Sequence, residues 1–264
     1  MRHVEYTTPN RWIVASGAKP EAVARLFCFS HAGAGVAAYR GWAEAASSRL
    51  EVCTIQLPGR ENRLRETPST SLEELASALA DAIHSMSERP FAVFGHSLGG
   101  IIAFETIRQL RRSGGAIPTA LFVSASRAPQ FPWPHSPVRH LGDLELLTEV
   151  HRRYGSVPEV ILEDAELRQL LTPALRADMT VMETYRHEAE APFGFPIVAF
   201  GGDEDRMVGR PDLEGWSEQT SGAFRLRMLA GDHLFLQTRR RELLDEIEGT
   251  LGLSHSQRLT ASSR

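Results

Sequence analysis

Short, nearly uninterrupted apolar runs alternate with helical patterns along most of this 264-residue chain. Runs of this kind are typical of strands that are buried on both faces of a parallel sheet. The predicted strands are 11–15, 25–30, 51–56, 91–95, 119–125, 196–201 and 223–229. Because strands and helices take turns along the chain, the sequence predicts an α/β fold with a mostly parallel central sheet flanked by helices.

Helices of the predicted fold are marked by capping signals and by apolar spacing. Ser71 and Glu74 form the pattern of a capping box, and apolar residues then recur at helical spacing from Leu72 to Met86. A second apolar stripe follows His233 and extends to Leu251. Both patterns predict amphipathic helices that pack on the sheet.

One long stretch interrupts the alternation. Between residues 129 and 195 we expect no strand, but helical patterns cover 143–154, 164–171 and 175–187. We interpret residues 129–195 as a helical lid inserted into a core made of 1–128 and 196–253. The alternative is that these helices only thicken the fold. The polar segment 254–264 lacks periodicity and is expected to be a disordered tail.

Composition excludes several classes of protein. The net charge of −4 argues against a nucleic-acid-binding domain, which is usually basic. No uninterrupted apolar run exceeds four residues, whereas a membrane-spanning helix needs about 18. The N-terminus lacks a signal-peptide core, and Cys28 and Cys53 lie in predicted strands as free thiols, so a cytoplasmic location is expected. No metal-ligand spacing is present.

The sequence Gly-His-Ser-Leu-Gly at 95–99 carries the strongest chemical signal. It has the pattern G-x-S-x-G, and it lies between a predicted strand and a predicted helix. A tight turn at this junction lifts the serine hydroxyl clear of the sheet, and small flanking residues prevent collisions with the backbone. This context predicts that Ser97 is a nucleophile.

A serine nucleophile needs a base, and the base needs an acid that orients it. His233 is the candidate base, because it follows the last predicted strand and precedes the C-terminal helix. The acid is expected after strand 196–201, where Asp205 fits the spacing G-x-x-D-x-x-V from Gly202 to Val208. Asp203 is the competing carboxylate. The chain between acid and base leaves room for a helix at 211–219 and a strand, and the order serine, acid, histidine is the order known for this type of site.

An oxyanion hole needs two backbone N–H groups that point at the oxygen on which negative charge develops. Leu98 follows the nucleophile and is expected to supply one of them. The loop His-Ala-Gly-Ala-Gly at 31–35 follows an early strand, and its small residues allow close approach to a substrate, so Ala32 is the second candidate. We expect His31 to brace this loop through a hydrogen bond.

With these residues placed, the sequence resembles the type II thioesterases, which are stand-alone editing enzymes of polyketide and nonribosomal peptide synthetases. The resemblance covers about residues 25–250. It rests on FSHAG (29–33), PGRENR (58–63), GHSLGG (95–100), LRAD (175–178), ETY (183–185) and the Asp205 and His233 loops. The stretches PGRENR and LRAD are more specific than the serine motif. One departure is Asp232, where the family usually has glycine before the histidine.

The resemblance implies an α/β-hydrolase fold and a defined reaction. Ser97 would attack an acyl thioester on the phosphopantetheine arm of an acyl or peptidyl carrier protein, and water would then free the acid. Such an enzyme removes aberrant or stalled acyl groups in antibiotic biosynthesis. It needs no cofactor or metal of its own, and its partners are carrier proteins rather than nucleic acid or membrane. Because no carrier domain precedes residue 25, a free-standing protein is expected.

The lid would shape the acyl chamber. Candidate lining residues are Phe131, Trp133, Met179, Met182 and Tyr185, although these side chains could instead be ordinary core. Two other functions remain open from the sequence. One is a general carboxylesterase that uses the same three side chains, and the other is a catalytically silent α/β-hydrolase that acts as a binding partner.

Overall fold

The computed structural model describes residues 6–16 and 19–253 of the chain. Within them, a single sheet holds eight strands in the order β1-β2-β4-β3-β5-β6-β7-β8. The pairings β1–β2 and β2–β4 are antiparallel, and the pairings from β4 through β8 are parallel. The strands are β1 Tyr6–Asn10, β2 Ile13–Ser16, β3 Ala24–Phe29, β4 Leu50–Ile55, β5 Phe91–His96, β6 Leu121–Ser124, β7 Ile197–Gly202 and β8 Phe224–Leu229. The predicted α/β class and mostly parallel sheet are confirmed.

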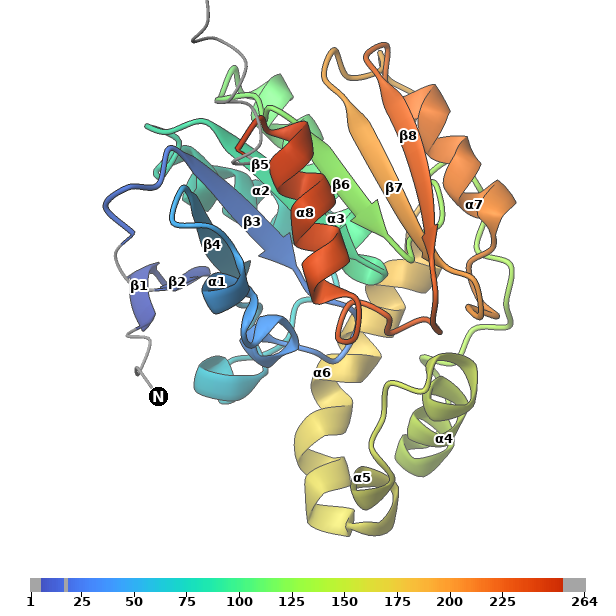
Figure 1. Cartoon of the computed structure of the whole chain (residues 1–264). Coiled ribbons are helices and arrows are strands. Elements are labelled where there is room, and N and C mark those ends of the chain that lie inside the picture. Colours follow the sequence, from blue (N-terminus) through green and yellow to red (C-terminus); the bar gives the residue numbers. More distant parts are fainter. Residues whose placement is uncertain (1–5, 17–18, 254–264) are drawn as a thin grey trace, which may run out of the picture.

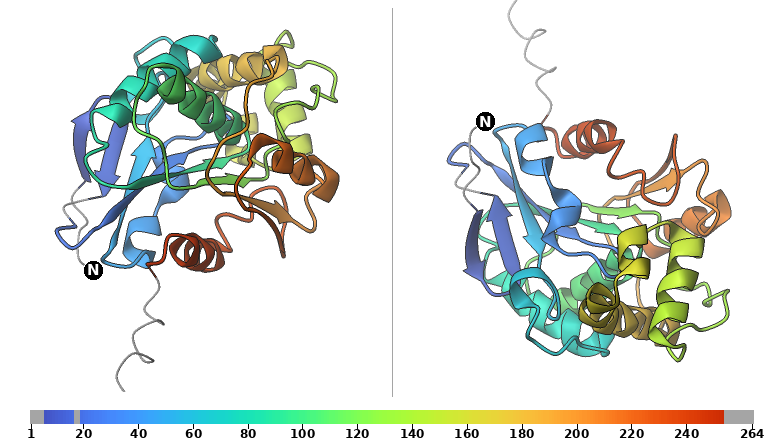
Figure 2. Two further views of the ribbon diagram at one scale, coloured as in Figure 1. Left: turned by 90° about the horizontal axis from the view of Figure 1, so that it is seen from above. Right: turned by 90° about the horizontal axis from the view of Figure 1, so that it is seen from below.

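Helices cover both faces of the sheet, as Figures 1 and 2 show. Helices α2 (Leu72–His84) and α3 (Leu98–Arg112) pack on one face, and α1 (Trp42–Ala45) and α8 (Arg240–Thr250) pack on the other. The strand residues divide between the two layers by alternation. In β3, for example, Phe27 and Phe29 join the α2–α3 core, whereas Leu26 and Cys28 join the α1–α8 core.

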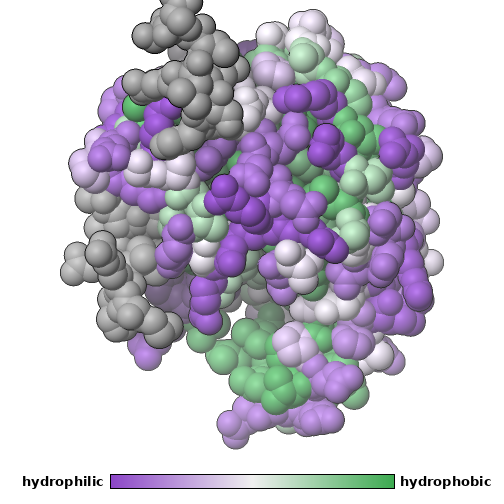
Figure 3. Space-filling model, viewed as in Figure 1, coloured by the Kyte–Doolittle hydropathy of each residue, from purple (hydrophilic) through white to green (hydrophobic). Residues whose placement is uncertain are grey.

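The helices α4 (Asp143–Tyr154), α5 (Glu159–Glu163) and α6 (Ala165–Thr184) come between β6 and β7. They extend beyond the carboxyl ends of the parallel strands, at the bottom of Figure 1. Their contacts form a small core of their own, with Leu146, Val150, Leu175 and Met179 among its members. We call α4–α6 the lid helices. Apolar side chains gather on this part of the molecule in Figure 3. Val160, in α5, is 56% exposed.

Two details of the sequence-based prediction are wrong. The segment Tyr6–Asn10 forms the edge strand β1, which the apolar pattern did not reveal. The two helices expected at 164–171 and 175–187 are one helix, α6, which continues through Pro173. A proline inside a helix removes one hydrogen bond, but Thr172 and Leu175 on either side are buried and hold the helix against its neighbours. The tail expected at 254–264 lies outside the described residues.

The remaining elements place the loops of the site. The short helix α7 (Arg210–Glu214) and the 3-10 helix η3 (Gly215–Gln219) connect β7 to β8, and the predicted helix at 211–219 is therefore confirmed. The 3-10 helices η1 (Val36–Tyr39) and η2 (Glu61–Arg63) follow β3 and β4. Among the described residues, we find no helix that is long and apolar enough to cross a membrane.

Candidate active site

Ser97 lies on the turn that joins β5 to α3. Its backbone has φ 55° and ψ −121°, which is a strained conformation for a residue with a side chain. The flanking glycines are required by close packing. A β-carbon on Gly95 would lie 2.4 Å from Gly99 O, and one on Gly99 would lie 2.2 Å from Phe29 O. The turn therefore presents the Ser97 hydroxyl at the carboxyl end of the sheet, as the motif predicted.

The structure brings the three predicted side chains together, although they come from distant parts of the chain. His233 Nε2 lies 3.0 Å from Ser97 Oγ, and His233 Nδ1 lies 2.8 Å from Asp205 Oδ2. The Asp205 carboxylate accepts a hydrogen bond from Nδ1–H, so the lone pair of Nε2 faces the serine hydroxyl. The Asp205 side chain is fully buried, and that of His233 is 5% exposed. This arrangement can take a proton from Ser97 and return it to a leaving group.

The loop after β7 holds the acid in place. Asp205 Oδ1 accepts hydrogen bonds from Met207 N at 2.8 Å and Val208 N at 3.2 Å, so its other oxygen is left to His233. The competing carboxylate, Asp203, accepts from Gly231 N at 3.0 Å and ties the acid loop to the histidine loop. Asp232, the departure from the family pattern, is exposed and accepts from Leu234 N.

His96, the residue before the nucleophile, connects β5 to the histidine loop. Its Nε2 lies 2.9 Å from the carbonyl oxygen of His233, and its Nδ1 lies 2.9 Å from Ser124 Oγ. Because a carbonyl only accepts, Nε2 carries the proton and Nδ1 accepts from the Ser124 hydroxyl. Burial, reinforced by His233 and His31, holds the pKa of His96 well below its usual value and keeps the ring neutral. Sequence reasoning assigned no role to His96.

The glycine loop after β3 reaches the same place. Ala32, His31, Ser97 and His233 line one small cavity. In the part of the chain that the structure describes, the Ala32 N–H has no hydrogen-bond acceptor. Leu98 is the first residue of α3, so its N–H has no acceptor within the helix. The two backbone donors named from the sequence are therefore both free to bind an oxyanion.

The expected brace from His31 is absent. The ring of His31 is buried, and its Nδ1 has no hydrogen-bond partner among the described residues. The loop is instead held by Asp178 of α6, which accepts from Gly33 N at 2.7 Å. Burial, helped by the nearby His233 and Arg60, lowers the pKa of His31 to about 4.

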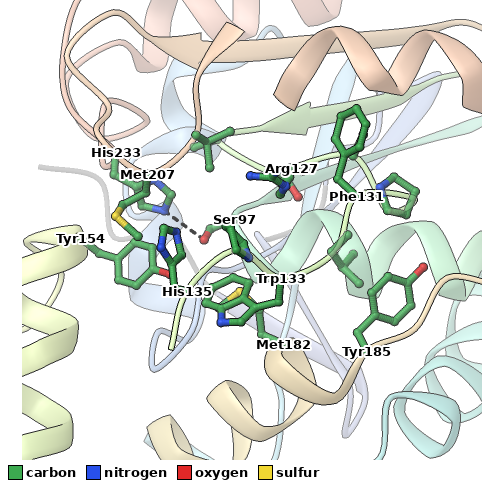
Figure 4. A pocket seen from close by; sticks show the side chains of 17 residues that line it. Ser97, Arg127, Phe131, Trp133, His135, Tyr154, Met182, Tyr185, Met207 and His233 are labelled. Carbon is green, nitrogen blue, oxygen red and sulfur yellow. Dashed lines mark hydrogen bonds between the residues drawn. The ribbon is translucent and has the colours of Figure 1, made fainter. Parts of the chain in front are cut away.

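A cavity of about 60 Å³ opens beside Ser97 and His233 (Figure 4). Four of the five candidate lining residues contribute to its wall, namely Phe131, Trp133, Met182 and Tyr185. The fifth, Met179, lines the smaller cavity that also contacts Ala32 and Ser97. The lid therefore contributes to the walls of both cavities, through α4 and α6.

Comparisons with known proteins identify the family of this chain. A family model described as a thioesterase domain matches residues 24–251. The chain belongs to the thioesterase family. Its activity is therefore the hydrolysis of thioesters.

Several individual relatives belong to biosynthetic pathways. The gramicidin S biosynthesis protein GrsT of Aneurinibacillus migulanus is 40% identical over 236 residues, which cover 89% of this chain and 92% of the relative. Among solved structures, the RedJ thioesterase of the prodiginine pathway in Streptomyces coelicolor is 37% identical with a TM-score of 0.81, and the match covers 88% of this chain and 92% of RedJ. The type II thioesterase BorB of the borrelidin cluster is 34% identical with a TM-score of 0.81, over 93% of this chain and 98% of BorB.

Several residues around the reacting groups of the thioesterase were missed by sequence reasoning. Tyr154, at the end of α4, has its ring 4.9 Å from the ring of His233, and it lines both cavities. His135, Met207 and Arg127 also line the larger cavity. The spacing of α4 predicted a helix, but no sequence signal showed that its last residue reaches the histidine.

A metal site is not evident in the described ranges 6–16 and 19–253, where no three metal-ligating side chains gather.

The guanidinium of Arg127, which lines the larger cavity, is paired with a carboxylate. Arg127 lies 2.8 Å from Asp212, and its guanidinium covers the ring of Phe131. The larger cavity thus offers a mainly apolar wall with one neutralised cation.

Proposed function

We propose that this thioesterase removes acyl groups from the phosphopantetheine arms of carrier proteins in a polyketide or nonribosomal peptide synthetase. The contact that carries the proposal is the chain of hydrogen bonds from Ser97 through His233 to Asp205. The type of substrate is supported by relatives whose names place them in gramicidin S and borrelidin biosynthesis. Acyl or peptidyl carrier proteins are therefore the proposed partners, in the cytoplasm.

The proposed mechanism follows from the geometry. His233 takes the proton of Ser97 as Oγ attacks the thioester carbon, and the imidazolium is stabilised by Asp205. The N–H groups of Ala32 and Leu98 bind the oxyanion. His233 then donates its proton to the leaving thiol, which leaves an acyl group on Ser97. A water molecule activated by His233 hydrolyses this ester and frees the acid. The reaction uses side chains and water, so we propose no cofactor in this chain.

The volume of the cavity favours short acyl groups. The space beside Ser97 is about 60 Å³, which is small for an acyl chamber, and its wall is mainly apolar. Acetyl, propionyl and butyryl groups are therefore the proposed substrates. Longer acyl groups are expected to require an outward shift of the lid helices. We therefore propose that the enzyme edits carriers that hold short, misplaced acyl groups.

The test is acid release from a series of acyl-carrier proteins, from acetyl to decanoyl, by the enzyme and by Ser97→Ala. We expect rapid release of short acids and a loss of at least about 10³-fold in the variant. Ser113→Ala is a matched control, since this exposed serine lies at the other end of α3. Equal turnover of simple oxygen esters and carrier thioesters would point to a general carboxylesterase. No turnover of either would point to a silent binding protein.

A further inference from the structure

Two stretches that contain no reacting group, PGRENR (58–63) and LRAD (175–178), meet beneath the glycine loop. Arg60 follows β4, and Asp178 lies in the second half of α6. Their side chains form a two-pronged ion pair, with Nη1 2.7 Å from Oδ2 and Nη2 2.9 Å from Oδ1. The side chains are only 5% and 2% exposed. A charge pair buried this completely holds a fixed geometry, because water cannot replace either partner.

Both members of the pair also bind the backbone of the glycine loop. Asp178 Oδ2 accepts from Gly33 N at 2.7 Å, and Arg60 Nη1 donates to Ala34 O at 3.1 Å. Leu175 lies one turn earlier on α6 and packs against the same glycine. A β-carbon on Gly33, whose φ is +77°, would lie 3.2 Å from Leu175 Cδ1. The glycine loop is therefore fixed by α6 at the point where the ion pair contacts it.

The contact falls next to the proposed oxyanion donor. Because the N–H of Gly33 is already bound to Asp178, it cannot bind the substrate oxygen. Among the described residues, the neighbouring N–H of Ala32 remains without an acceptor, and its direction depends on the peptide that Asp178 holds. Oxyanion donors act only when they are held in place before the reaction, within about half an ångström.

The charge state of the pair suits this role. Burial alone would lower the pKa of the Arg60 guanidinium, but the charge and hydrogen bonds of Asp178 outweigh burial and raise it. Arg60 therefore stays charged. Arg63, in the same stretch, has a different role, because it donates to Gln56 O and pairs with Glu66, away from the glycine loop.

We propose that Arg60 and Asp178 are positioning residues that aim the Ala32 N–H at the oxyanion and make its placement depend on the position of lid helix α6. The proposal rests on the proposed function, in which Ala32 is an oxyanion donor. It goes beyond that function because it gives a role in catalysis to a lid residue that touches no substrate. When α6 moves away, the loop loses its anchor and the oxyanion hole is incomplete.

The experiment compares Asp178→Asn and Arg60→Lys with the control Glu183→Gln. Glu183 is also buried on α6 and accepts from Val138 N at 2.6 Å, but it does not contact the glycine loop. Each variant is assayed with p-nitrophenyl propionate and with a propionyl-carrier protein, and its thermal midpoint is measured. Labelling of Ser97 by a fluorophosphonate gives a second readout, since this reaction also builds negative charge on an oxygen in the site.

We expect Asp178→Asn to lower kcat by about 10- to 100-fold with KM within about twofold, which is less than the ~10²–10³-fold loss from removing a donor outright. Labelling slows in parallel. Arg60→Lys keeps the charge and loses less. We expect Glu183→Gln to keep kcat within about threefold of the wild type, even if its thermal midpoint falls as much as that of Asp178→Asn.

Three results would overturn the proposal: an unchanged kcat in folded Asp178→Asn and Arg60→Lys, a loss confined to KM, or an equal loss of kcat in Glu183→Gln. Should Asp178→Asn fail to fold, Arg60→Lys against Glu183→Gln decides the question. Failure of the proposed function looks different. In that case the wild type cleaves the small ester but releases no acid from carriers, and the variant comparison still proceeds on the ester.

Discussion

The buried imidazole of His31 predicts a specific loss of stability in acid. Its pKa is about 4 in the folded protein and ordinarily 6.5, a difference of 6.5 − 4 = 2.5 units. Between these two values the unfolded chain binds a proton that the folded chain does not. The free energy of unfolding therefore falls as the pH falls through 6.5, and the loss is complete near pH 4. At about 1.4 kcal/mol per pH unit, the integrated loss between pH 7.5 and 5.0 is about 2 kcal/mol.

The assay is urea unfolding at pH 7.5 and 5.0 for the wild type and His31→Asn. We expect the wild type to lose about 2 kcal/mol more than the variant between these values. The neutral, buried His96 acts in the same direction in both proteins, because burial, the main cause of its lowered pKa, does not depend on His31. His84→Asn serves as the control because His84 is exposed on α2, and it should keep the wild-type slope. Equal losses in wild type and His31→Asn would refute the reasoning.

Three further outcomes are expected. Gly99→Ala places a β-carbon 2.2 Å from Phe29 O, so the turn must shift; we expect a loss of at least about 2 kcal/mol in urea unfolding and of most activity, and a variant with wild-type stability would contradict this packing. Ser97→Gly relieves the strain of a side chain at φ 55° and should abolish hydrolysis while raising the free energy of unfolding by about 1 kcal/mol; a destabilised variant would argue against strain. Met182→Ala enlarges the larger cavity and should shift the preferred acyl group toward longer chains in the carrier series, whereas an unchanged profile would place the acyl group elsewhere.

The central fold could be predicted because strands buried on both faces leave an apolar signal that needs no knowledge of their neighbours. The edge strand β1 leaves no such signal. Its sequence, Tyr-Thr-Thr-Pro-Asn, is polar and contains Pro9, and proline within a strand is tolerated mainly at a sheet edge. The sequence predicts two helices in place of α6 because local propensity treats Pro173 as a break, whereas buried contacts on both sides of the proline keep the helix continuous.

The catalytic side chains could be predicted from local sequence, whereas the cavity walls depend on contacts between distant parts of the chain. Ser97, Asp205 and His233 could be named because each lies in a loop whose own sequence fixes its shape. The walls of the cavities depend on how α6 is rotated against the core. Met179 and Met182 are only three residues apart, yet Met182 lines both cavities and Met179 lines the smaller one alone, and no periodic pattern distinguishes them.

The prediction that His31 braces the glycine loop is wrong for a related reason. The sequence offered His31 as the nearest polar side chain, but the actual acceptor for Gly33 N is Asp178, 145 residues away. In the sequence, the stretches PGRENR and LRAD indicate the family but show no physical link to each other. Only the three-dimensional contact between Arg60 and Asp178 gives those stretches a physical reason to occur together.

The hydrogen bond from His96 to the carbonyl of His233 has a consequence for protein engineering. The residue adjacent to the nucleophile holds the backbone of the base, so the spacing of serine and histidine is set within the core, and the lid adds the contact of the Tyr154 ring with the imidazole. The segment that carries α4–α6 could then be exchanged for one that encloses a larger or smaller space without retuning the distance between Ser97 and His233. A graft of this kind has two requirements: the incoming segment supplies a carboxylate that accepts from the N–H of Gly33 and pairs with Arg60, and a ring that packs against His233.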